Sequence, residues 1–285
     1  MAYTFDLLTQ IHDMYNLFSP VEEKVASYVI ENAHDVINQS ITDLAEKCNV
    51  SVSTVSRFCR HVSLNGYQEF RVELVRSLSN QEESPSSQQR DISPEDTVPD
   101  MFSKMSTLYE DTFNKVLAGL DPVAFSRVCD MIVAAKDVHF IGTGNMLPIA
   151  LAANLQFMEV STKFRCLTDA SAQALSTALM TEDSLVIVYS FSGEALSGVQ
   201  VARFAKKSNA KVVAITRYVQ SPLVSIADEV LICNVSHTTR MSSSLALCSG
   251  FQFITDLLYT EFFRRNTEVC KANQAKSIGR IIGHS

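Results

Sequence analysis

Five short apolar segments in the second part of the chain constrain its fold more than any other feature. Val and Ile are frequent in these segments, and helical patterns lie between them. The segments are VHFIG (138–142), KFRCLT (163–168), SLVIVYS (184–190), KVVAITR (211–217) and EVLICNV (229–235). Near-continuous apolar strands that alternate with helices are typical of a parallel sheet covered on both faces. We therefore predict an α/β body with a five-stranded parallel sheet flanked by helices, in a doubly wound arrangement.

A change of composition divides the chain into a head and this body. The stretch at 78–100 contains three prolines, no aromatic residue and few apolar residues, which is typical of an exposed linker. We predict an all-helical head at 1–77, a linker at 78–100 and the body at 101–285, which are ordinary sizes for two domains. Within the body, two helical segments precede the first strand, and a long helix at about 242–265 closes the chain.

The composition excludes several classes of protein. Hydrophobic residues make up 46% of the chain and charged residues 19%, as in ordinary globular proteins. No run of about 18 apolar residues is present, so we expect no membrane span. The first twenty residues lack the basic start of a signal peptide. The seven cysteines form no CxxC pair, and none of the six histidines has a metal-spaced partner. We therefore expect a cytoplasmic protein with reduced cysteines, no metal and no cofactor.

Residues 41–61, ITDLAEKCNVSVSTVSRFCRH, predict two short helices joined by a tight turn. Ala45 is small enough to let the two helices approach closely. Asn49 falls at the turn, and Asn tolerates the left-handed backbone conformation better than most residues. Val55 is spaced to face back onto the first helix. This pattern indicates a helix-turn-helix, whose second helix, from about Ser51 to His61, enters a groove of DNA.

The charge of the head limits how it could bind DNA. The net charge of the chain is −7, and the first eighty residues contain six Lys and Arg against ten Asp and Glu. Between Glu46 and Glu69, however, there is no acidic residue, while Lys47, Arg57 and Arg60 lie in that stretch. A small basic face on an acidic domain favours a site-specific DNA-binding protein over a non-specific one.

Candidate DNA-binding residues lie on the second helix of this pair. Arg can bond to guanine or to a phosphate, and hydroxyl groups can bond to phosphates or to base edges. The candidates are Ser51, Ser53, Thr54, Ser56, Arg57 and Arg60. The alternative is a solvated helix face, and either Ser51 or Ser53 can serve as the helix cap.

Two loops rich in small residues follow the first and third predicted strands. Ligands of parallel α/β sheets bind at the carboxyl ends of the strands. Glycine amides, serine hydroxyls and helix N-termini can hold a phosphate or another anion there. The candidate ligand-binding residues are Gly142, Thr143, Gly144, Asn145, Ser190, Ser192, Gly193 and Glu194. Tight strand–helix connections need small residues in any case, so the prediction depends on the pair of loops rather than on either one.

Three body motifs, FIGTGN, VIVYSFSGE and VVAITRYVQSPLVSIADEVL, resemble the sugar isomerase (SIS) domain, a phosphosugar-binding fold. The head carries SITDLAEKCNVSVSTVSRFCRHVSLNGYQEFR, and the whole chain apart from the linker resembles the RpiR family of bacterial transcriptional regulators. Those proteins join an N-terminal helix-turn-helix to a C-terminal SIS domain. The resemblance implies a double-stranded DNA operator and a phosphosugar effector as partners, a homodimer or homotetramer, and no membrane.

The chain departs from the family pattern in three places, and in one of them a Ser-Arg pair that is common near the start of the last helix is not found around 247–248. Ala195 stands where family members often carry another Ser or Thr, and Asn145 stands where a Ser is common. A regulator whose sugar site has decayed is therefore one alternative. A phosphosugar isomerase is another, but it needs an acid and a base beside the sugar carbonyl. Glu194 is the obvious carboxylate, and at a helix start it is more simply a partner of the helix dipole. We therefore expect a sensor rather than an enzyme.

Overall fold

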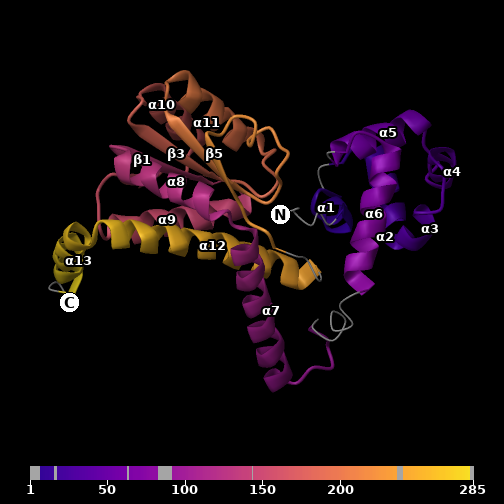
Figure 1. Ribbon diagram of the computed structural model, residues 1–285, viewed down its shortest axis with the longest axis horizontal. Coiled ribbons are helices and arrows are strands. Elements are labelled where there is room, and N and C mark those ends of the chain that lie inside the picture. The colour runs from indigo at the N-terminus through magenta and orange to yellow at the C-terminus, as the bar shows by residue number, and fades with distance from the viewer. Residues whose placement is uncertain are drawn as a thin grey trace. The chain divides into compact units, whose positions relative to one another are not determined.

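The computed structural model describes residues 7–15, 18–62, 64–82, 92–142, 144–235 and 240–282 (Figure 1). The chain forms two compact units, and the main boundary between them lies between Lys104 and Met105. Helix α6 ends at Glu82 and helix α7 begins at Val98, so both described ends of the predicted linker are helical. The division at 77 and 100 remains a prediction.

The described residues of the head unit form six helices before α7. They are α1 (Leu7–Asp13), α2 (Pro20–Glu31), α3 (Ala33–Val36), α4 (Ile41–Lys47), α5 (Val52–His61) and α6 (Tyr67–Glu82). The start of α2 is stabilised by the Ser19 amide, which donates to the Glu22 carboxylate at 3.1 Å. The Ser40 amide donates to Asp43 at 2.9 Å in the same way and stabilises the start of α4. Helices α1 and α3 are additional to those predicted from the sequence.

Helices α4 and α5 form the predicted helix pair. Ala45 and Val55 are both buried in the head core, where the two helices meet. Asn49 has a φ of 52°, the left-handed conformation that the turn requires. The Ser51 hydroxyl accepts a hydrogen bond from the Thr54 amide at 3.2 Å, so Ser51 is the cap of α5. The prediction of two short helices joined by a tight turn is confirmed.

A five-stranded parallel sheet forms the centre of the body. Its strands are β1 (Asp137–Gly142), β2 (Phe164–Cys166), β3 (Ser184–Tyr189), β4 (Lys211–Thr216) and β5 (Glu229–Ile232), in the spatial order β2-β1-β3-β4-β5. All four strand pairs are parallel. The central strand β3 is buried along its whole length, which explains its unbroken apolar sequence. The predicted fold class is confirmed.

Helices cover both faces of this sheet. The helices of this unit after the first are α8 (Pro122–Ala134), α9 (Leu147–Met158), α10 (Ala170–Ala178), α11 (Leu196–Lys207), α12 (Arg240–Arg265) and α13 (Thr267–Ile282). Helix α7 (Val98–Gly119) precedes them, and Val116 near its end is buried in the body core. On one face, Val138 and Phe140 of β1 pack in a cluster with residues of α8, α9 and α12. On the other face, Ile141 and Val186 pack with residues of α11. In the described ranges, no helix is both long and apolar enough to cross a membrane.

The prediction that a long helix closes the chain is wrong. Helix α12 matches the predicted element, but α13 follows it after a turn at Asn266 and runs in a different direction (Figure 1). The Thr267 hydroxyl donates to the Phe263 and Arg264 carbonyls at the end of α12. Among the described side chains of helix α13 only Cys270 is buried, so its sequence shows no clear buried stripe.

Candidate functional site

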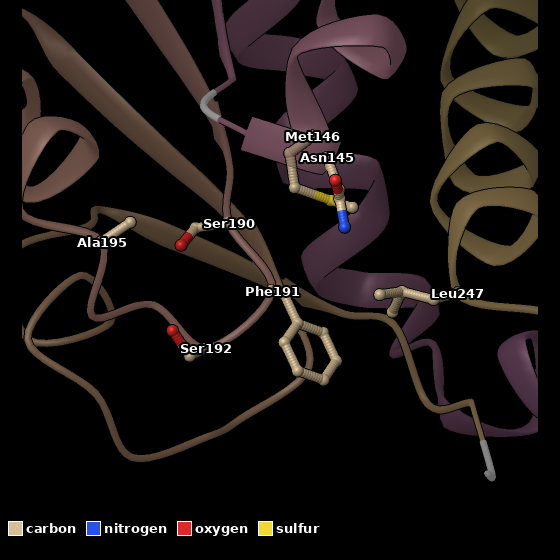
Figure 2. A pocket seen from close by; sticks show the side chains of 7 residues that line it. All are labelled: Asn145, Met146, Ser190, Phe191, Ser192, Ala195 and Leu247. Carbon is tan, nitrogen blue, oxygen red and sulfur yellow. The ribbon is translucent and has the colours of Figure 1, made fainter. Parts of the chain in front are cut away.

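A pocket lies at the carboxyl edge of the sheet, where the loops after β1 and β3 come together (Figure 2). Its volume is about 210 Å³. The lining residues are Asn145, Met146, Ser190, Phe191, Ser192, Ala195 and Leu247. Three of these, Asn145, Ser190 and Ser192, are among the predicted ligand-binding residues. The two predicted loops therefore contribute to one site.

Two glycines explain how these loops reach this geometry. Gly193 has a φ of +70°, and a Cβ at this position would lie 2.1 Å from the Ser221 hydroxyl oxygen. Gly142 has no room for a side chain either, because a Cβ would lie 2.3 Å from the carbonyl oxygen of Met146. Both loops thus require glycine where the backbone turns or passes close to a neighbouring segment.

The two pocket serines are oriented by the backbone of their own loop. The Gly193 amide donates to the Ser190 hydroxyl at 3.1 Å, and the Glu194 amide donates to the Ser192 hydroxyl at 3.2 Å. Each hydroxyl therefore accepts from the loop and keeps its own proton to donate. Both hydroxyl oxygens lie on the side of the loop on which Ala195 is found (Figure 2). The pair is suited to donate hydrogen bonds to an anion.

The start of helix α11 adds to this preference for an anion. The helix begins at Leu196, directly after the serine loop, and its cap residue Ala195 provides no side-chain hydrogen bond. The first amides of a helix carry partial positive charge and bind anions readily. The short 3₁₀ helix η3 (Gly144–Met146) leads directly into α9, so a second helix start lies beside the pocket.

Other predicted residues lie beside the pocket rather than on its wall. Gly142, Gly144 and Gly193 shape the loops, and Glu194 is half-buried next to Ser192. Thr143 lies outside the described residues. Among the described residues that line the pocket, none has a titratable side chain. In the described part of the chain, no cluster of three or more His, Cys, Asp or Glu side chains could hold a metal ion.

The apolar wall of the pocket is the part that sequence reasoning missed. It consists of Met146, Phe191 and Leu247. The Phe191 ring contacts the Tyr218 ring, and the Arg217 guanidinium lies 5.8 Å from the Phe191 ring centre. Met146 and Phe191 lie within or next to the two predicted loops, so their positions in the sequence could have identified them as lining residues. Leu247 lies on α12 and looks like any core leucine in the sequence.

The predicted DNA-binding residues all belong to α5 or its cap. Ser53, Arg57 and Arg60 are exposed, and Ser56 is half-exposed. Thr54 is only 5% exposed, and its hydroxyl lies 2.9 Å from that of Ser51. Thr54 therefore has little surface to offer to DNA.

Sequence comparison assigns both parts of the chain to known domains. The helix-turn-helix domain of the rpiR family matches residues 5–81, and the SIS domain matches residues 131–259. The regulator HexR of Escherichia coli is 26% identical over 260 residues, which cover 91% of this chain and 89% of that protein. HexR of Pseudomonas aeruginosa is 29% identical over 214 residues, which cover 74% and 73% of the two chains.

Solved structures agree with the fold. The Vibrio vulnificus NanR protein, solved complexed with ManNAc-6P, has a TM-score of 0.61 at 24% identity and covers 98% of this chain and 99% of its own. The sugar isomerase domain of an RpiR transcription factor from Sphaerobacter thermophilus has a TM-score of 0.56 at 21% identity, covering 65% of this chain and 99% of its own.

These features define a class of protein in which a helix-turn-helix head precedes an SIS-type α/β body. Within that class, the chain belongs to the RpiR family of helix-turn-helix transcriptional regulators.

Proposed function

We propose that this regulator is a cytoplasmic protein whose affinity for a DNA operator is controlled by a phosphorylated sugar or amino sugar bound in the SIS body. The observation that carries the proposal is the pair of serine hydroxyls, Ser190 and Ser192, beside the uncapped start of α11. Together they provide hydrogen-bond donors and positive potential for a phosphate. The ManNAc-6P bound by the NanR protein is a ligand of this chemical class.

Binding in the pocket, rather than turnover, is the role that we propose for the body. An isomerase needs an acid and a base beside the sugar carbonyl. Among the described residues that line the pocket, no side chain has a titratable group. Relatives across most of the chain are named as transcriptional regulators. An assay for interconversion of ketose and aldose phosphates by the purified protein tests this point, and turnover would contradict it.

The head is proposed to bind its operator through α5 as part of a homodimer or homotetramer. Helix-turn-helix proteins usually place two recognition helices on two half-sites of a palindromic sequence. The head is acidic and has one small basic face, so a single head gains little binding free energy from the phosphate backbone. Tight binding therefore depends more strongly on the pairing of two heads.

A thermal-shift screen against sugar phosphates and amino-sugar phosphates tests the effector site. We expect at least one compound to raise the melting temperature of the wild-type protein, because a ligand that binds only the folded state stabilises it. The Ser192→Ala variant should lose most of this shift. Ser225→Ala is the matched control, since Ser225 lies on the exposed loop after β4 and its hydroxyl donates to the Pro222 carbonyl. A shift that Ser192→Ala leaves unchanged would place the effector elsewhere.

A gel-shift titration tests the DNA-binding helix. A duplex selected in vitro from a random library serves as the operator. We expect Arg57→Ala to weaken binding by about tenfold or more, as the loss of a guanine or phosphate contact does. Arg76→Ala is the control, because Arg76 is an exposed arginine of α6 paired with Glu73. Equal affinities of the two variants would contradict the placement of α5 as the recognition helix.

A further inference from the structure

Helix α5 has two distinct faces. The buried face consists of Thr54, Val55, Phe58 and Cys59, which pack into the head. At 100° per residue, Ser53, Ser56, Arg57 and Arg60 fall on the opposite half of the helix. These four are the hydroxyl and guanidinium side chains expected of a surface that contacts DNA. Val52 falls at the border between the two faces, beside Cys59.

Val52 is an exposed apolar side chain at the first position of this helix. It is 40% exposed, while Val50, two residues earlier, packs against the head core. Within the described head, Val52 is not among the residues that form or border that core. Part of its apolar surface therefore stays accessible to a partner.

The hydrogen-bonding groups around Val52 are already engaged with one another. The Ser51 and Ser53 hydroxyls lie 2.7 Å apart, and Ser51 also caps the helix. The first turn of α5 therefore offers methyl groups to a partner, with hydroxyls at the margin. Arg57 follows five residues later, or about 7.5 Å further along the helix axis, which corresponds to roughly two base-pair steps.

We propose that Val52 reads a thymine in each operator half-site through the C5-methyl group of that base. Thymine alone presents a methyl group in the major groove, and apolar side chains recognise it by contact. The first residues of a recognition helix are those that reach base edges. The proposal rests on the proposed role of α5. It adds that specificity at one position comes from an apolar contact, about two to three base pairs from the base pair that faces Arg57.

The test replaces thymine by uracil in the selected duplex. Deoxyuridine removes only the C5-methyl group and leaves every hydrogen-bonding group of the base in place. Each thymine is replaced in turn, at symmetry-related positions of both half-sites, and affinity is measured by fluorescence anisotropy. For the wild-type protein we expect one position at which uracil weakens binding by about fourfold per half-site, the value of one buried methyl group.

The Val52→Ala variant should bind the thymine and uracil duplexes almost equally at that position. Val72→Ala is the matched control, because Val72 on α6 is 48% exposed, close to the 40% of Val52, and its loss should leave the wild-type preference for thymine. Circular dichroism checks that both variants are folded. A Val52→Ala protein that keeps the wild-type preference, or a wild-type protein with no uracil-sensitive position, overturns the proposal.

The Arg57→Ala variant distinguishes a wrong role for Val52 from a wrong assignment of α5 as the recognition helix. If Arg57→Ala weakens binding while Val52→Ala retains the preference for thymine, α5 is the recognition helix and only the role of Val52 is wrong. If neither substitution changes affinity, the proposed role of α5 fails and the inference about Val52 fails with it.

Discussion

Gly193 is the residue on which the shape of the pocket depends most directly. It has a positive φ, and a Cβ would collide with the Ser221 hydroxyl oxygen at 2.1 Å. Gly144 also has a positive φ, of +55°, but a Cβ there would meet no atom within 4 Å. Substitution of Gly144 therefore measures the cost of backbone strain alone. Substitution of Gly193 measures backbone strain together with a steric clash.

We expect Gly144→Ala to lower the free energy of unfolding by about 1 kcal/mol, the cost of a left-handed non-glycine residue. Gly193→Ala should lower it by about 3 kcal/mol, because the loop must also move away from Ser221. The displaced loop should lose the thermal shift given by the effector as well. Urea titrations measure both values, and equal losses for the two variants would show that the contact with Ser221 is unimportant.

Residues with a distinctive backbone or chemical requirement were predictable from the sequence. Asn49 was identifiable because a tight turn needs a left-handed residue, and its φ of 52° agrees. Ser190 and Ser192 were identifiable as pocket residues because their loop and the loop after β1 both follow strands of one parallel sheet. Leu247 was not, since an apolar residue that lines a pocket carries the same pattern as one that fills the core.

At the scale of elements, Glu22 connects the first turn of α2 to the end of α5. Its carboxylate accepts from Ser19 and lies 3.5 Å from the His61 imidazole. Burial raises the pKa of Glu22, but the hydrogen bonds from Ser19 and the proximity of His61 outweigh it, so the pKa lies below its ordinary value of 4.5. A lowered pKa means that the carboxylate stabilises the head fully above that ordinary value and loses this contribution as the pH falls through the folded-state pKa.

Glu22→Gln should therefore lower the free energy of unfolding at pH 7 by about 1 kcal/mol. It should also reduce the loss of stability on acidification below pH 4.5. Glu23→Gln, one residue further along α2, is the control. Urea titrations between pH 3 and pH 7 measure the effect, and an unchanged pH profile in Glu22→Gln would contradict the role of this contact.

Lys163 holds the end of helix α8. Its ammonium group donates to the carbonyls of Ile132, Val133 and Ala135 at 2.6, 3.2 and 3.0 Å. These carbonyls lie in the last turn of the helix, where carbonyl groups have no partner within the helix and a positive charge is favourable. The side chain also lies over the rings of Phe164 and Phe262.

We expect Lys163→Met to lower the free energy of unfolding by about 2 kcal/mol, because it leaves carbonyl groups without a donor. Lys136→Met is the matched control, since Lys136 is largely exposed and pairs with Asp183 at the surface, where ion pairs contribute little. Differential scanning calorimetry compares the stabilities of the two variants. A Lys163→Met protein as stable as Lys136→Met would show that water molecules supply the hydrogen bonds to the carbonyl groups at the end of α8.

The strands were the elements most readily predicted, because β1, β3 and β4 are buried enough to require mainly apolar sequences. Helices were predicted where a cap residue or an apolar stripe marked them, as Asp121 marks α8 through its bond from the Val123 amide. Helix α13 was missed because it has no clear apolar stripe, although Asn266 before it is of a residue type that caps helices. Helix boundaries shifted by a few residues for the same reason, since a helix can continue beyond its last buried residue.

At the scale of the whole molecule, the two units carry separate halves of one activity. The pocket belongs to the body, and α5 belongs to the head. A small molecule changes DNA affinity only if it binds one arrangement of the heads more tightly than another. The sequence predicted both halves because each has its own motifs. The identity of the effector was not predictable, because it depends on the apolar wall and volume of the pocket.

The operator affinity of the full-length protein, measured by fluorescence anisotropy with and without its effector, tests the account most directly. We predict that a sugar phosphate that stabilises the protein changes the Kd for the selected duplex by about fivefold or more, the usual range of coupling between two sites. Ser192→Ala should bind the duplex with wild-type affinity and show no change with effector. A stabilising sugar phosphate that leaves the operator Kd of the wild-type protein unaltered would contradict the proposed function.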